Sequence, residues 1–200
     1  MNKDARYLIR LANAASYAPA DHERLLQQVR ERLRPLGAQA INLRVSRSAV
    51  EFDLFCKPER KAESFLPVLE SIGAPVTVRR LDLPLGPVDL PAGRQGPQDV
   101  ITEARNLFNA ERYWEVHEVL EGLWKKTRGQ EKQLLQGLIL AAAALVHVQK
   151  DQGRVAWAML EEAARRLQDQ PPAYYGLDVQ GFSQNLKKVI ASRTINFLTV

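Results

Sequence analysis

The sequence predicts an α+β protein. Its N-terminal half contains both strands and helices, and its C-terminal half contains helices alone. Residues 1–83 alternate between segments with the two-residue period of strands and segments with helical period. Residues 98–200 are patterned as helix throughout. Between the halves, residues 81–98 contain four prolines and three glycines, a density that regular elements do not tolerate. We therefore expect one domain over 1–83, a linker over 84–97 and a second domain over 98–200.

The first domain is expected to contain four strands and two helices. Alternating apolar residues mark the strands, which are 5–13, two strands within 39–57 that are joined by a turn near Ser46–Ser48, and 75–83. Helical spacing marks 21–37 and 58–73, and Pro67 predicts a kink in the second of these. The resulting order, β-α-β-β-α-β, is that of the ferredoxin-like sandwich.

The second domain is expected to be a five-helix bundle. The helical segments are 100–110, 113–126, 131–152, 154–168 and 178–193. Short connections between them favour a compact bundle. Because 131–152 is apolar on nearly all sides, we expect it to be the buried central helix.

Composition narrows the class of protein. The single cysteine, Cys56, excludes an internal disulfide framework and a cysteine-rich zinc site, and it fits a reducing compartment. The longest apolar run, 138–148, is too short to span a bilayer. The N-terminal segment lacks the pattern of an export signal, because Arg10 interrupts its apolar run. These features predict a cytoplasmic protein without a membrane partner.

Basic residues are in mild excess, and most of the excess lies in the first domain. The formal net charge is +5, and residues 1–96 carry 15 Lys and Arg against 11 Asp and Glu. The sheet face away from the helices would present Arg44 together with Glu51 and Asp53, and these acids would repel phosphate. We therefore expect this face to pack on the helical half or on a second subunit in a homo-oligomer, and nucleic acid is the less favoured partner.

The segment 113–124, YWEVHEVLEGLW, contains the candidate site. On a helix, His117 and Glu121 lie one turn apart on the same side, where they can hold one divalent metal ion. Glu118 occupies the position of the general base in the zinc-protease motif HExxH, with Glu121 in place of the last histidine. The expected pocket residues are Tyr113, Trp114, Glu115, Trp124 and Gln136, of which Glu115 lies off the face of His117 and Glu121, near the start of the helix.

A catalytic zinc site needs about three protein ligands, so a further one should come from another helix. Within the apolar segment 131–152 the polar candidates are Gln136 and His147, of which His147 is the candidate metal ligand. The two lie too far apart along the helix axis to contact one metal together. The alternative is structural: a half-buried histidine beside a glutamate is often a hydrogen-bonded pair that orients packing.

The helical half resembles domain-of-unknown-function family 309, a family of small all-helical bacterial and archaeal proteins, over residues 98–170. The resemblance rests on a clustered motif and on two later helices. The matching residues are Phe108, Asn109, Tyr113, Glu115, His117, Glu118, Glu121 and Trp124, then Gln136, Gly137, Leu138 and Ile139, and finally Gly153 with Ala158. The resemblance implies an all-α bundle and a shared polar pocket, and the family is sometimes labelled a predicted metal-dependent hydrolase.

Three functions compete at this point. The first is a metal-dependent hydrolase of a small-molecule substrate, with zinc, manganese or iron held by His117 and Glu121 and with Glu118 as the base. The second is a non-catalytic scaffold, because the helices also resemble a tetratricopeptide-like pair, although only two such units occur. The third is a nucleic-acid-linked role of the sheet face.

Overall fold

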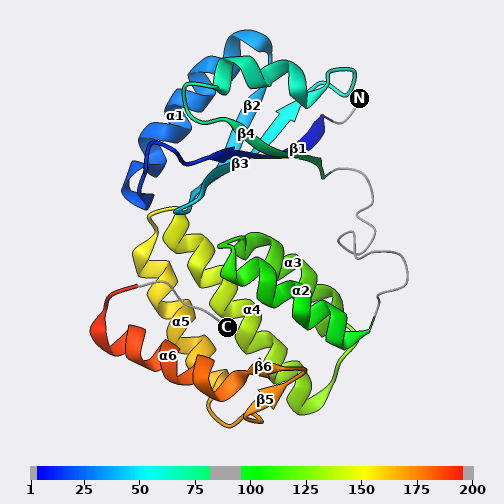
Figure 1. Ribbon diagram of the computed structural model, residues 1–200, viewed down its shortest axis with the longest axis vertical. Coiled ribbons are helices and arrows are strands. Elements are labelled where there is room, and N and C mark those ends of the chain that lie inside the picture. The colour runs from blue at the N-terminus through cyan, green and yellow to red at the C-terminus, as the bar shows by residue number, and fades with distance from the viewer. Residues whose placement is uncertain (1–3, 82–95, 196–200) are drawn as a thin grey trace. The chain divides into compact units, whose positions relative to one another are not determined.

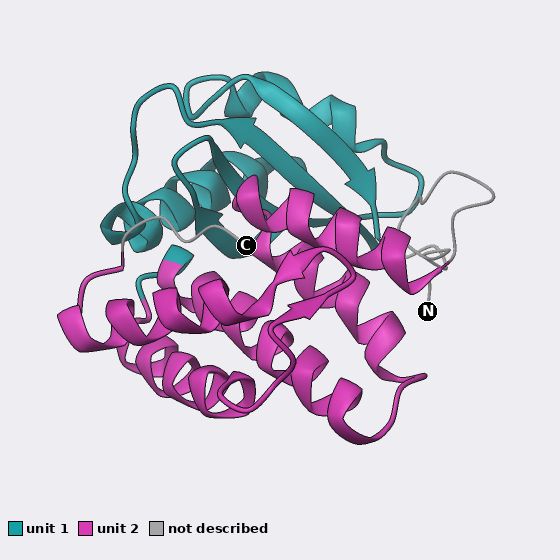
Figure 2. Cartoon of the chain, turned by 60° about the horizontal axis from the view of Figure 1, so that its bottom comes forward, with its two compact units in different colours: residues 1–85, 149–151 teal, residues 86–148, 152–200 magenta. Residues whose placement is uncertain are grey.

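The computed structural model describes residues 4–81 and 96–195. The chain divides into two compact units, one of residues 1–85 with 149–151 and the other of residues 86–148 with 152–200 (Figure 2). Most of the expected linker, 84–97, lies outside the described residues. Its last residue, Pro97, is described and begins the first helix of the second unit.

Over its described residues, 4–81, the first unit is a four-stranded sheet with one α-helix and three short 3-10 helices (Figure 1). Its elements are β1 (Ala5–Ala12), η1 (Pro19–Asp21), α1 (His22–Leu33), η2 (Arg34–Leu36), β2 (Gln39–Val45), β3 (Ala49–Cys56), η3 (Ala62–Leu69) and β4 (Pro75–Arg80). The strand order is β2-β3-β1-β4 and each neighbouring pair is antiparallel. This confirms the expected β-α-β-β-α-β sandwich.

Alternation along the strands produces the core of this unit. Ile9 and Phe52 are directly opposite each other on β1 and β3, and both are fully buried. Leu25 of α1 and Phe65 of η3 belong to the same apolar cluster. Since apolar residues at every second strand position share one face, the helices cover only that face of the sheet.

The other face of the sheet carries paired charges. Asp53 accepts a hydrogen bond from Arg6 at 2.7 Å, Glu51 pairs with Arg10, and Arg44 approaches both acids at 3.5 to 3.8 Å. These cross-strand pairs place opposite charges on adjacent strands. The guanidinium groups of these three arginines are therefore engaged with carboxylates.

The second helical segment of this unit is shorter than expected and of a different type. A helix was expected over 58–73, but η3 is a 3-10 helix that spans only Ala62–Leu69. Pro67 lies inside it, has no N–H to donate, and clashes with an α-helical carbonyl four residues earlier. The proline therefore prevents an α-helix, where the sequence had suggested only a kink.

The described part of the second unit, 96–148 and 152–195, contains five α-helices, as expected. They are α2 (Pro97–Asn109), α3 (Tyr113–Trp124), α4 (Gly129–Gln149), α5 (Gly153–Leu167) and α6 (Val179–Ser192). A two-stranded hairpin of β5 (Ala173–Tyr174) and β6 (Leu177–Asp178) was not expected. Its turn residues, Tyr175 and Gly176, have φ of 45° and 79°, the combination that tight hairpin turns require.

Helix α4 is the central element of the bundle, as its sequence indicates. It lies between the α2–α3 pair and the α5–α6 pair (Figure 1). No residue from Leu134 to Gln149 is exposed. Gly137 of α4 allows close approach of α5, because a Cβ at this position would lie 2.7 Å from the Leu167 side chain.

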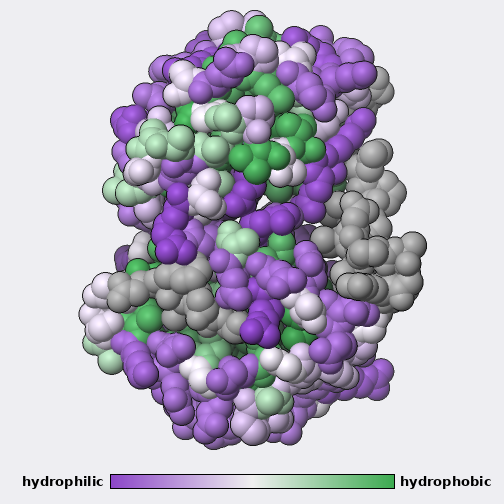
Figure 3. Space-filling view, viewed as in Figure 1, coloured by the Kyte–Doolittle hydropathy of each residue, from purple (hydrophilic) through white to green (hydrophobic). Residues whose placement is uncertain are grey.

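Within residues 4–81 and 96–195, no helix combines the length and the hydropathy needed to cross a bilayer. On the face seen in Figure 3, hydrophilic residues cover most of the helical unit, and hydrophobic residues are scattered among them.

Candidate functional site

Helix α3 has one buried side and one partly exposed side. Val116, Val119 and Leu120 are buried in the core of the helical unit. Their spacing of three and four residues puts them on one stripe of the helix. His117 and Glu118, which lie between them in the sequence, consequently point away from the core or along its rim.

Glu115 has a structural position at the start of α3. Its carboxylate is almost fully buried and accepts two hydrogen bonds from Arg112, at 2.7 and 2.6 Å. A carboxylate in the first turn also interacts favourably with the helix dipole. Glu115 is not among the residues whose ligand atoms cluster farther along α3.

His117, Glu118 and Glu121 form the candidate metal site. One ligand atom from each, an imidazole nitrogen or a carboxylate oxygen, lies within 4.8 Å of the others. The three side chains are about one-third exposed, so the group is reachable from solvent. The sequence had placed His117 and Glu121 one turn apart, and the structure brings Glu118 to the same point.

The carboxylate of Glu118 favours the protonated form of the His117 imidazole. The distance from His117 Nδ1 to Glu118 Oε1 is 3.4 Å. Hydrogen bonding to Glu118 raises the pKa of His117 above 6.5, and partial burial opposes this effect. The charges of Glu118 and Glu121 raise the pKa further, whereas that of Lys125 lowers it. A positive charge, from either a proton or a metal ion, is therefore favoured at this position.

The donor set fits a divalent transition metal. Imidazole nitrogen and carboxylate oxygen are ligands that zinc, iron and manganese accept. Atoms bound tetrahedrally to one zinc at about 2.0–2.2 Å lie about 3.3–3.6 Å apart, so the observed limit of 4.8 Å requires the side chains to close by up to about 1.5 Å. Three protein ligands would leave coordination positions open for water or substrate.

Two lysines and a tryptophan lie beside this group. Lys125 Nζ is 3.2 Å from Glu121 Oε1, one turn farther along α3. Lys132 of α4 places its Nζ 4.2 Å from the centre of the Trp124 ring. Trp124 is half-buried, and among the described residues its Nε1 makes no hydrogen bond. Sequence analysis had missed the two lysines, although Lys125 follows Glu121 by the i,i+4 spacing of helical ion pairs.

The other expected site residues have different surroundings. His147 is absent from the cluster of ligand atoms, and its Nδ1 lies 2.6 Å from Gln152 Oε1 at the end of α4. Tyr113 is buried and packs edge-on against Phe108, with ring centres 5.1 Å apart. Gln136 and Trp114 are half-buried on α4 and α3.

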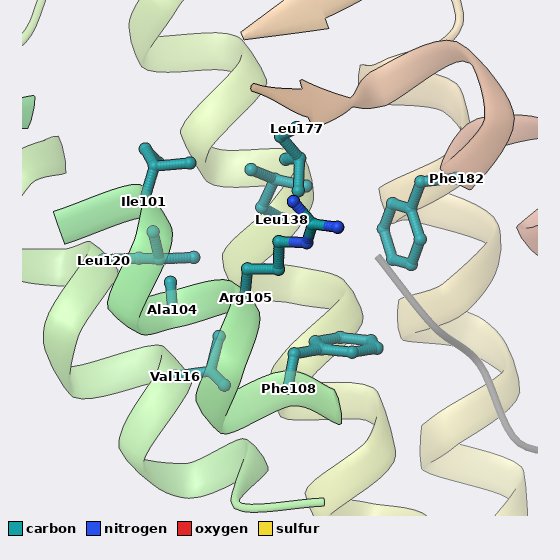
Figure 4. Close-up of a pocket in the computed structure, with 9 residues that line it drawn as sticks. All are labelled: Ile101, Ala104, Arg105, Phe108, Val116, Leu120, Leu138, Leu177 and Phe182. Carbon is teal, nitrogen blue, oxygen red and sulfur yellow. The ribbon is translucent and has the colours of Figure 1, made fainter. Parts of the chain in front are cut away.

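The helical unit also contains a small apolar cavity (Figure 4). Its lining residues are Ile101, Ala104, Arg105, Phe108, Val116, Leu120, Leu138, Leu177 and Phe182. The space open to the centres of water-sized molecules is about 20 Å³, room for about one water molecule. None of the expected site residues lines it, and His117, Glu118 and Glu121 lie instead on the partly exposed side of α3.

Comparison with known proteins places the helical unit in a family. Residues 101–159 match the model of the domain of unknown function DUF309. A conserved hypothetical protein from Thermus thermophilus, known from a crystal structure, is 38% identical; the match covers 46% of this chain and 95% of that protein, with a TM-score of 0.41. No curated protein matched the chain. Through residues 101–159 of its helical unit, the chain belongs to the DUF309 family.

Proposed function

We propose that the protein is a metal-dependent hydrolase whose metal is held by His117 and Glu121 on α3. The observation that carries the proposal is the convergence of three donor atoms from His117, Glu118 and Glu121 within 4.8 Å. Zinc, manganese and iron are the metals that this donor set favours.

A divalent metal at this position would polarise a substrate oxygen and make a water molecule more acidic. The side chains of the site would supply the metal ligands and the general base. His117 and Glu121 supply a nitrogen and an oxygen ligand, whereas Glu118 accepts the proton of the attacking water. Glu118 suits this role because its carboxylate lies among the donors and, about one-third exposed, remains accessible to water.

The test is metal binding by the full chain purified without chelator. Elemental analysis and calorimetric titration with Zn²⁺ and Mn²⁺ should give close to one equivalent for the wild type. The His117→Ala/Glu121→Ala variant should lose at least about a hundredfold in affinity, because both proposed ligands are gone. Glu118→Gln should retain metal and lose hydrolytic activity.

Two controls make the result specific. His147→Ala removes the other histidine of the helical unit and should leave the metal content unchanged, because His147 lies outside the donor group. Circular dichroism should show that the double variant remains folded. Metal content below a tenth of an equivalent in the wild type, with no stabilisation by added metal, would overturn the proposal.

A further inference from the structure

We propose that the site on α3 binds the dianionic phosphoryl group of a phosphate ester through Lys125 and Lys132, an inference that rests on the metal-dependent function proposed above. The observations are the contact of Lys125 with a candidate metal ligand and the fixed position of Lys132 over Trp124.

The position of Lys125 is unfavourable for binding a metal alone. Its ammonium is 3.2 Å from Glu121 Oε1, and its charge also acts on His117. Like charges at such separations repel, so the lysine weakens the binding of a cation by these ligands. The arrangement becomes favourable when an anion bridges the metal and the ammonium group.

Trp124 brings a second ammonium group to the same end of α3. It follows Glu121 by three residues and His117 by seven, which puts the indole on their side of the helix. The ring face attracts the Lys132 ammonium through a cation–π interaction, at 4.2 Å from the ring centre. The lysine from α4 is thereby held against the indole at the C-terminal end of α3.

Charge balance identifies the class of anion. The carboxylates of Glu118 and Glu121 neutralise a divalent metal, so the two ammonium groups remain as a net charge of plus two. A phosphate monoester carries close to two negative charges at neutral pH and offers three acceptor oxygens. A carboxylate would neutralise only half of this charge. Lysine is also a common phosphate ligand, acting as a point charge.

The experiment is a calorimetric titration of the full chain with phenyl phosphate, with and without Mn²⁺. In the Lys125→Gln/Lys132→Gln variant, phenyl phosphate affinity should fall about tenfold or more, while Mn²⁺ affinity stays equal or increases. The matched control, Lys187→Gln/Lys188→Gln, removes the same charge from two exposed positions on α6. Its affinity should change less than about twofold at 0.15 M salt, where distant exposed charges are screened.

Benzoate, a monoanion of similar shape, should bind the wild type about tenfold more weakly than phenyl phosphate. Equal losses in the two double variants, or equal binding of the two ligands, would overturn the inference. If Mn²⁺ does not bind, the hydrolase proposal fails by itself. Metal-free binding of phenyl phosphate that depends on Lys125 and Lys132 would still support the anion site, and its absence would refute it.

Discussion

His117 is the residue of the candidate site whose charge depends most on its neighbours. Two carboxylates attract a proton to its imidazole, and partial burial and Lys125 oppose protonation. The same balance of charges determines how strongly the imidazole favours a metal ion. Its titration is therefore a direct measure of the electrostatics of the site in the metal-free protein.

In chelator-treated protein, the pKa of His117 should exceed 6.5 and fall toward 6.5 in Glu118→Gln, because the largest cause of the increase is the hydrogen bond to Glu118. The imidazole proton resonances, followed by NMR as a function of pH, give both values. Because the pKa is raised by folding, the ion pair's contribution to the free energy of unfolding is fully present below pH 6.5 and is lost as the pH rises through the raised pKa.

The control for this measurement is Glu103→Gln on α2, which removes a carboxylate outside the donor group. The titration of His117 should be the same in this variant and in the wild type. An unchanged titration in Glu118→Gln would show that the 3.4 Å contact does not exist in solution.

At the scale of the element, close packing of α4 against α5 depends on one glycine. A Cβ on Gly137 would lie 2.7 and 2.8 Å from two carbon atoms of Leu167 and 3.4 Å from Arg166 Cβ. Leu167 is 1% exposed and belongs to the core, so it has little room to move. The small residue in the Gln-Gly-Leu-Ile motif is thus explained by helix packing.

Gly137→Ala should lower the free energy of unfolding of the helical unit by about 1–3 kcal/mol, the usual cost of overpacking a core. The matched control is Gly122→Ala on α3, where a Cβ would have no atom within 4 Å. The control should be stabilised by about 0.5–1 kcal/mol, because alanine favours helix over glycine.

Urea denaturation followed by tryptophan fluorescence measures both variants, since the three tryptophans, Trp114, Trp124 and Trp157, all lie in the helical unit. Changes of the same sign in the two variants would contradict the packing explanation, because helix propensity alone predicts stabilisation in both.

At the scale of the whole molecule, the residues that the structure describes form two separate hydrophobic cores. One contains Phe52, Leu54 and Phe65 of the sheet unit, and the other contains Leu138 and Leu160 of the helical unit. No residue belongs to both clusters. A substitution that opens a cavity in one core should accordingly affect the stability of that unit.

Leu54→Ala should destabilise the sheet unit by about 2–5 kcal/mol, because a fully buried leucine leaves a cavity. Hydrogen exchange at the amides of β1 and β3 should accelerate, whereas the tryptophan fluorescence transition of the helical unit should stay in place. The reciprocal variant, Leu160→Ala, should shift the fluorescence transition and leave the strand amides protected. A shift of both transitions by either variant would show that the units unfold together.

The sequence alone was enough to predict the four strands of the first sheet and the α-helices of the described chain, because hydrophobic period is a local property; it missed the 3-10 helices and the β5–β6 hairpin. It predicted the strand and helix order of the first unit, the five helices of the second, and the buried position of α4. The same periodicity separated Glu115 from His117 and Glu121 on α3, since successive residues about 100° apart must diverge around a helix.

The tertiary structure decided which side chains from distant segments meet. The pairing of Lys132 with Trp124, the contact of Gly137 with Leu167 and the strand order β2-β3-β1-β4 depend on chain segments that only folding brings together. His147, the expected cross-helix ligand, is an example. The helix that contains it was predicted, but its contact with Gln152 was not. Periodicity fixes the direction of a side chain from its own helix axis, whereas the packing of helices against each other determines what that side chain contacts.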